Sequence, residues 1–164
     1  MEFNEITNII QASTRDDIFA ELNTKNIQPY AIVSTADLLP VCELLYNHSS
    51  LFFDYLTCVT GIDNGVEKNT LEVVYHFYSI PFGHQFILKV ILPRTIESLP
   101  SVPSISTIWH GANWHEREAA EMFGIHFENH PDLRKLLLPN DWQGFPLRKD
   151  YKAQEEYHGI KVAY

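Results

Sequence analysis

The chain has 164 residues, of which 45% are hydrophobic and 20% charged, a composition typical of one soluble globular domain with a core of its own. Its net charge of −9 argues against nucleic acid as a partner, and no cluster of basic residues offsets that charge. No apolar run approaches the roughly 18–20 residues that span a bilayer. Neither GxGxxG nor GxxxxGK[ST] occurs, so the sequence predicts no nucleotide-binding loop.

The chain has two cysteines, Cys42 and Cys58, and they are too few and too widely spaced for a four-cysteine iron–sulfur or zinc site. They also do not form the pattern of a disulfide framework. We therefore expect a reducing compartment.

The first third of the chain predicts short helices around one strand. Spaced apolar residues from Ile6 to Leu22 indicate one or two amphipathic helices, and residues 30–33 indicate a strand. Residues 34–48 predict a second helix, which Ser34 or Thr35 caps and in which Pro40 falls near the first turn.

Residues 51–63, 70–80 and 84–93 are rich in β-branched and aromatic residues, which predicts three strands. The pair Asn64-Gly65 favours a hairpin between the first two. Both alternating sets of 86–92 are mostly apolar, which predicts an inner strand covered on both faces. We expect an α+β fold, in which helices cover one side of a mixed, largely antiparallel sheet.

Residues 94–113 are expected to be a connector, followed by a short helix. A capping box of Asn113 and Glu116 would begin this helix, and Gly124 would end it. After Gly124 the periodicity is lost, although leucine and aromatic residues continue. Residues 1–123 carry 6 basic and 15 acidic side chains and residues 124–164 carry 6 of each. We therefore divide the chain into an α+β domain, 1–123, and an extended docking segment, 124–164.

The stretch WHEREAAEMFGIHFENHPDLRKLL, residues 114–137, concentrates histidine and charged residues. His115, Glu118, His126 and His130 could together hold a metal, but the sequence lacks the second histidine of HExxH. Glu116 and Glu118 are two residues apart and point to different faces of a helix, which suits no joint acid–base site. Enzyme chemistry is thus the weaker hypothesis.

The charges on this short helix are too many for a helix exposed only to water, so some must pair with other groups. The partners are either the chain's own C-terminal segment or another subunit, and the sequence leaves both open. Arg134 has the planar guanidinium that suits a carboxylate. Trp109 and Trp114 are expected to be core or interface anchors. We expect docking by Trp114, Glu116, Arg117, Glu118, Glu121, His130, Asp132, Arg134, Asp141, Trp142, Arg148, Lys149 and Asp150.

Several of these motifs resemble a known family. Glu116-Arg117-Glu118, Glu121-Met122-Phe123, His130 and Arg134-Lys135-Leu136-Leu137 have the spacing of the signature of the 30 kDa subunit of respiratory complex I. Residues 51–63, 100–118 and 141–151 resemble further parts of that family. Asn129 stands where glycine is common, and asparagine tolerates positive φ. Lys152 stands where proline is frequent.

The resemblance implies a peripheral-arm subunit of proton-translocating NADH:quinone oxidoreductase. It implies no catalytic residue, no flavin (FMN) and no iron–sulfur cluster in this chain, since partner subunits hold them. The main partner would be the large subunit that shapes the quinone site, on the cytoplasmic side of a bacterial inner membrane. The chain would meet the membrane only through the complex.

Three alternatives remain from the sequence. The chain could be the equivalent subunit of a related membrane-bound hydrogenase. It could be a metal-dependent hydrolase that uses the His/Glu cluster of 115–130, or a soluble adaptor unrelated to electron transfer.

Overall fold

The computed structural model describes residues 1–95 and 98–162. Its elements are α1 (Phe3–Ser13), β1 (Phe19–Asn23), β2 (Tyr30–Val33), α2 (Thr35–Asn47), β3 (Tyr55–Asp63), β4 (Thr70–Ser79), β5 (His84–Pro93), β6 (Ser101–Pro103), α3 (Ala112–Phe123), β7 (His126–Glu128), β8 (Glu156–Tyr157) and β9 (Ile160–Lys161). The α+β prediction is confirmed.

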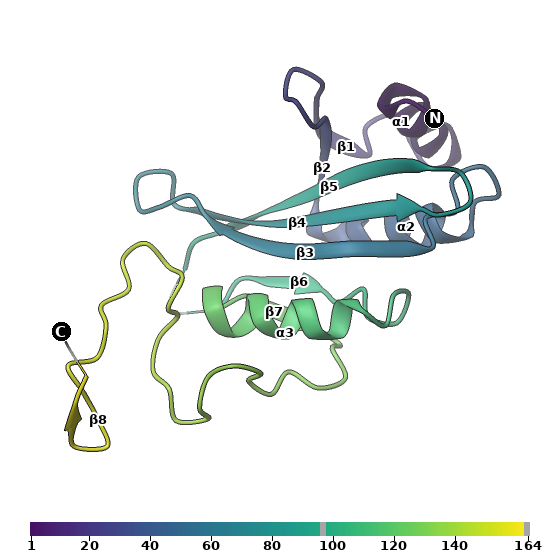
Figure 1. Cartoon of the computed structure of the whole chain (residues 1–164). Helices are drawn as coiled ribbons and strands as arrows, with labels where there is room; N and C mark the ends of the chain where they lie inside the picture. Colours follow the sequence, from purple (N-terminus) through teal and green to yellow (C-terminus); the bar gives the residue numbers. More distant parts are fainter. Residues whose placement is uncertain (96–97, 163–164) are drawn as a thin grey trace.

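A five-stranded sheet in the order β1-β2-β5-β4-β3 organises the chain (Figure 1). Only β2 and β5 run parallel in it, and every other neighbouring pair is antiparallel. Alternation along β4 and β5 sends Tyr75, Phe77 and Leu88 into the core, where they are at most 1% exposed. On the opposite face, which carries His76 and Lys89, none of the described helices is packed.

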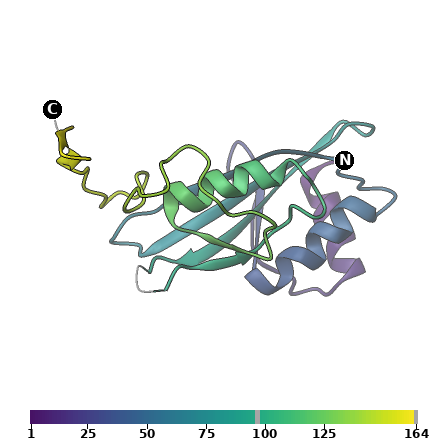
Figure 2. The same ribbon diagram turned by 90° about the horizontal axis from the view of Figure 1, so that it is seen from below.

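The three helices contribute to one core on the inner face of the sheet (Figure 2). Ile6 and Ile10 of α1, Leu38 of α2 and Ala112 of α3 are fully buried there. The predicted cap of α2 is confirmed, because the Ser34 hydroxyl accepts a hydrogen bond from the Asp37 N–H. α3 lies along β3, and the C-terminal segment runs from it to the small β8–β9 hairpin (Figure 1).

Three expectations about local structure are wrong. Phe19 and Leu22 belong to strand β1 and not to a helix, because pairing with β2 satisfies their backbone. β5 is an inner strand as predicted, but Ile91 on its outer face is 45% exposed. The connector contains β6, which pairs in parallel with β7.

Pairing with β6 brings the start of the C-terminal segment into the core. Ile125 and Phe127 are 1% and 0% exposed. The division at residues 123 and 124 remains a prediction. Within residues 1–95 and 98–162, no helix has the length and apolar character needed to cross a bilayer.

Candidate docking site on helix α3 and the C-terminal segment

Helix α3 begins without the predicted capping box. Gly111 is the N-cap residue, no side chain caps the helix, and Glu116 turns inward. The other end is as predicted, because Gly124 adopts the left-handed conformation with φ 67°. A Cβ atom at Gly124 would lie 2.5 Å from the Phe145 ring, so this position requires glycine for space as well as for conformation.

Glu116 is the most deeply buried of the predicted site residues, with 0% exposure. Its carboxylate accepts hydrogen bonds from the Ser104 hydroxyl at 2.6 Å and from the Ile105 N–H at 2.8 Å. Burial raises the pKa of Glu116 from 4.5 to about 7, and the two hydrogen bonds oppose that change. Its contacts with Ser104 and Ile105 fix α3 to the loop that follows β6.

Glu121 and Arg117 bind the main chain of the C-terminal segment. The Glu121 carboxylate accepts hydrogen bonds at 2.9, 2.9 and 3.2 Å from three consecutive N–H groups, those of residues 136, 137 and 138. The Arg117 guanidinium donates to the Arg134 carbonyl at 2.8 Å and to the Lys135 carbonyl at 3.3 Å. Two opposite charges on one helix thus hold residues 134–138 through their backbone.

His130 anchors the turn between β7 and this segment. Its Nδ1 accepts a hydrogen bond from the Asp132 N–H at 3.0 Å, so in the neutral ring Nε2 carries the proton and donates to the Asn113 carbonyl at 3.1 Å. Burial lowers the pKa of His130, which favours this neutral form. Asn129 before it has φ 60°, which confirms the expected positive φ.

The metal hypothesis finds no support at these residues. Both ring nitrogens of His130 bind backbone groups, and His126 is exposed on β7. In the part of the chain that the structure describes, no group of three or more His, Cys, Asp and Glu side chains is placed to hold a metal ion.

Arg148 holds the far part of the segment at the C-terminus of α3. Its guanidinium donates to the carbonyls of Phe123, Thr95 and Gly124 at 2.7, 3.1 and 3.3 Å. Positive charge is favourable at this end of a helix, where carbonyls lack partners within the helix. Next to it, the Leu147 N–H donates to the Met122 carbonyl at 3.1 Å.

A buried charge network joins the end of β3 to the segment. Asp63 accepts hydrogen bonds from the Arg94 Nε at 2.9 Å and from the Lys149 N–H at 2.8 Å. Arg94 also binds Asp150. The side chains of Arg94 and Asp63 are only 5% and 1% exposed. The sequence-based prediction omitted Arg94 and Asp63, and the position of Asp63 at the end of a strand was the only signal for either.

The remaining predicted site residues face solvent. Trp114 is 59% exposed, with the Arg117 guanidinium 5.4 Å from its ring, and Glu118 is exposed as well. The Arg134 side chain is 82% exposed and makes a two-point contact with Asp132. Asp141 accepts a hydrogen bond from the Tyr157 hydroxyl at 2.9 Å, and Trp142 lies 6.2 Å from the Tyr157 ring.

Exposed apolar side chains lie on the same part of the molecule. Leu137, Leu147 and Ile160 are 63%, 54% and 68% exposed. Inward charges on α3 therefore hold this chain's own segment, whereas outward charges and apolar groups remain accessible to another chain. The sequence had left these alternatives open, and the structure divides the residues between two environments.

The fold occurs in a solved respiratory assembly. A chain of the membrane-bound sulfane sulfur reductase, an archaeal respiratory membrane complex, has a similar structure with a TM-score of 0.74. The likeness covers 91% of this chain and 85% of that one at 20% identity, and at this identity it concerns the fold alone. The fold class is thus an α+β domain with an extended C-terminal segment.

Sequence relatives identify the family within that fold class. Residues 31–157 match the family "Respiratory-chain NADH dehydrogenase, 30 Kd subunit", and this chain belongs to it. An NADH-quinone oxidoreductase subunit of Chlorobium phaeobacteroides is 43% identical over 150 residues, covering 90% of this chain and 88% of the relative. The NADH-quinone oxidoreductase subunit of the same name from Chloroherpeton thalassium is 42% identical, covering 90% of this chain and 60% of the longer relative.

Proposed function

We propose that this chain is a non-catalytic peripheral-arm subunit of a membrane-bound NADH:quinone oxidoreductase, and that it acts through assembly with neighbouring subunits. The observation that carries the proposal is the match of residues 31–157 to the 30 kDa subunit family, together with relatives that are named as subunits of that enzyme. Through its assembly, the protein supports electron transfer from NADH to quinone coupled to proton translocation.

The geometry supports a role in docking. The C-terminal segment is fixed to the α+β domain at Glu121, Arg148 and Asp63, so its outward side chains have defined positions before any partner binds. A segment ordered in advance loses less conformational entropy on association. Its exposed leucines, together with Trp114, have the apolar and aromatic character of an interface core.

The remaining parts of the proposal concern what surrounds the chain. FMN and iron–sulfur clusters reside in partner subunits, and the chief neighbour is the large subunit that shapes the quinone site. The complex lies at the cytoplasmic side of a bacterial inner membrane, which this chain meets through its partners. These features follow from family membership and are open to direct test.

Isolation of the tagged chain from membranes tests the proposal. We expect it to sediment with membranes and to co-purify with flavin- and cluster-bearing chains, which mass spectrometry and cofactor analysis identify. Hydrogenase chains in place of an NADH-oxidising module would assign it to a related complex. A stoichiometric metal on a chain that purifies alone from the soluble fraction would instead support the hydrolase hypothesis.

A pair of matched variants separates docking from catalysis. Glu118→Ala removes an exposed carboxylate from α3, and Glu43→Ala removes one from α2, away from the proposed interface. We expect Glu118→Ala to reduce the amount of assembled complex and Glu43→Ala to leave it unchanged. Complete assembly of Glu118→Ala with loss of turnover would argue for a catalytic role.

A further inference from the structure

Cys58 lies beside a histidine on the outer face of the main sheet, opposite the face on which the described helices pack. Residues 58 and 76 are paired neighbours on β3 and β4. The Cys58 Sγ is 3.3 Å from the His76 Nδ1, and the Thr60 hydroxyl donates to the same sulfur at 3.8 Å. Cys58 is a free, half-buried thiol, so it combines a nucleophilic atom, an adjacent base and partial exposure to solvent.

The charges around this pair favour a His76 ring that can accept a proton. Burial, assisted by Lys89 on β5, lowers the pKa of His76, so the ring is neutral near pH 7. Lys89 itself binds Glu72 of β4 at 3.1 Å and lies 4.0 Å from the Tyr30 ring of β2. Neutral Nδ1 can therefore take the thiol proton, and the Thr60 hydroxyl can donate to the resulting thiolate.

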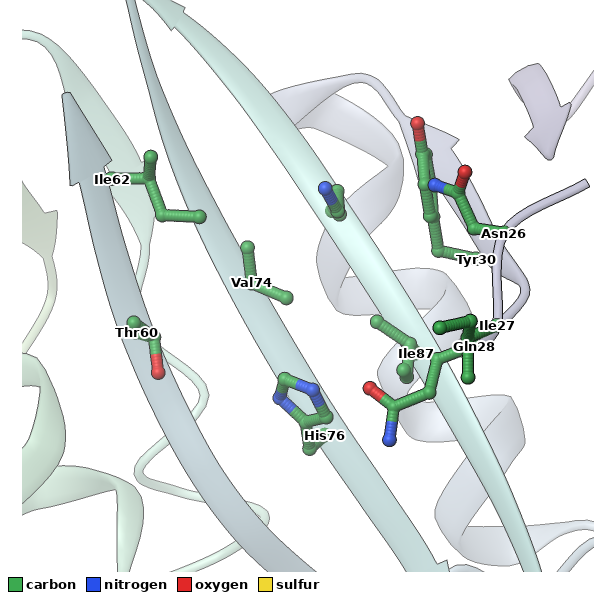
Figure 3. A pocket seen from close by; sticks show the side chains of 10 residues that line it. Asn26, Ile27, Gln28, Tyr30, Thr60, Ile62, Val74, His76 and Ile87 are labelled. Carbon is green, nitrogen blue, oxygen red and sulfur yellow. The ribbon is translucent and has the colours of Figure 1, made fainter. Parts of the chain in front are cut away.

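A cavity of about 600 Å³ adjoins the pair, with Thr60 and His76 in its wall on neighbouring strands (Figure 3). The side chains of Ile62, Val74 and Ile87 also line it. A small molecule with an apolar substituent could bury that group here beside the sulfur.

Cys42 provides an internal contrast. It is 0% exposed in the core under α2, and burial, with smaller contributions from Glu116 and Glu43, raises the pKa of its thiol well above the usual value. A buried neutral thiol of this kind is inert. Since the chain has only these two cysteines, reactivity at one and not the other can be attributed to its surroundings.

We propose that Cys58 is a reversible modification site that takes small disulfides with apolar substituents, with His76 as its base. The Cys58 proton passes to His76 Nδ1, and the thiolate attacks one sulfur of the disulfide RS–SR. A Cys58–S–SR bond forms, the RS–SR bond breaks, and the leaving RS⁻ takes the proton back from His76 as RSH. The disulfide is the oxidant, and a thiol reverses the exchange.

The test measures disulfide exchange on the full chain and on the assembled complex in membranes. The probe is 4,4′-dithiodipyridine, which is neutral and aromatic and releases a coloured thiopyridone, with the dianionic 5,5′-dithiobis(2-nitrobenzoate) as comparison. Peptide mass mapping assigns the modified cysteine. We expect modification at Cys58, retention of free Cys42, and faster reaction with the neutral probe.

His76→Gln tests the base. We expect it to slow modification about tenfold or more near neutral pH and to approach the wild-type rate in alkali, where solvent deprotonates the thiol. His126→Gln, which changes an exposed histidine on β7, should leave the rate unchanged, and Cys58→Ser should abolish modification of the folded chain.

Three results would overturn the proposal. One is a rate at Cys58 no greater than at Cys42, and another is a rate that His76→Gln leaves unchanged at neutral pH. The third is modification of the isolated chain with complete protection in the assembled complex, which would show that a partner covers this face.

Discussion

Helix α3 carries two sets of charged side chains that differ in what they bind. Glu116 and Glu121 are 0% and 6% exposed, and they accept hydrogen bonds mainly from main-chain N–H groups of this chain. Glu118 on the same helix and Arg134 beyond it face solvent. The difference shows that a single charged motif can serve both the stability of the folded chain and contact with another one.

The largest effect on stability is expected from Arg94→Ala, which belongs to the buried set. This change leaves the Asp63 carboxylate buried without its guanidinium, and such losses cost about 3–5 kcal/mol. Urea unfolding of the full chain measures it. Arg15→Ala is the matched control, because that side chain is 53% exposed and its pair with Asp37 lies at the surface. Equal losses for the two variants would contradict the distinction.

A second prediction concerns pH and Glu116. Its carboxyl binds a proton more tightly when folded, with a pKa of about 7 against 4.5, so its contribution to stability is greatest below about pH 4.5. That contribution falls as the pH rises to about 7, by about 3 kcal/mol in total. The free energy of unfolding of the wild type should therefore fall with pH relative to Glu116→Gln.

His130 has a lowered pKa, so its titration acts in the opposite direction. It is present in both proteins, and the difference between wild type and Glu116→Gln cancels its contribution. Urea unfolding across the range from pH 5 to pH 8 gives the measurement. Parallel curves for the two proteins would show that Glu116 does not titrate in this interval.

Glu121→Ala should release the near part of the C-terminal segment. It removes the acceptor of three main-chain N–H groups, with an expected loss of about 1.5–3 kcal/mol, since water replaces part of the interaction. Amide hydrogen exchange at residues 136–138 should accelerate. Glu118→Ala, three residues earlier on the helix, should leave this exchange unchanged, and acceleration in both variants would erase the contrast between inward and outward charges.

The smallest effect on the isolated chain is expected from Arg134→Ala. Its side chain is exposed, and it lowers the pKa of Asp132 through a surface ion pair. The thermal midpoint of the purified chain should therefore remain close to that of the wild type, while the yield of assembled complex falls. A large drop in the midpoint would place Arg134 with the residues that stabilise the fold.

Local sequence patterns predicted most of the fold. Alternation and β-branched residues gave three of the five strands of the main sheet, and Ser34 and Gly124 marked helix ends that the structure confirms. The failures have a common cause. Phe19 became part of a strand because β2 offered hydrogen-bond partners, and Asn113 did not cap α3 because Glu116 was drawn inward by Ser104 and Ile105.

The sequence by itself determined the family, the α+β class and which helix carries the charges, since these follow from spacing and composition. Only the tertiary structure decided where each charge points. Glu116, Glu118 and Glu121 are equal as letters, but three-residue and two-residue steps on a helix turn them toward different neighbours. Those neighbours, the loop at Ser104 and the backbone at Leu136, are distant in sequence, and burial among them gives each carboxylate its role.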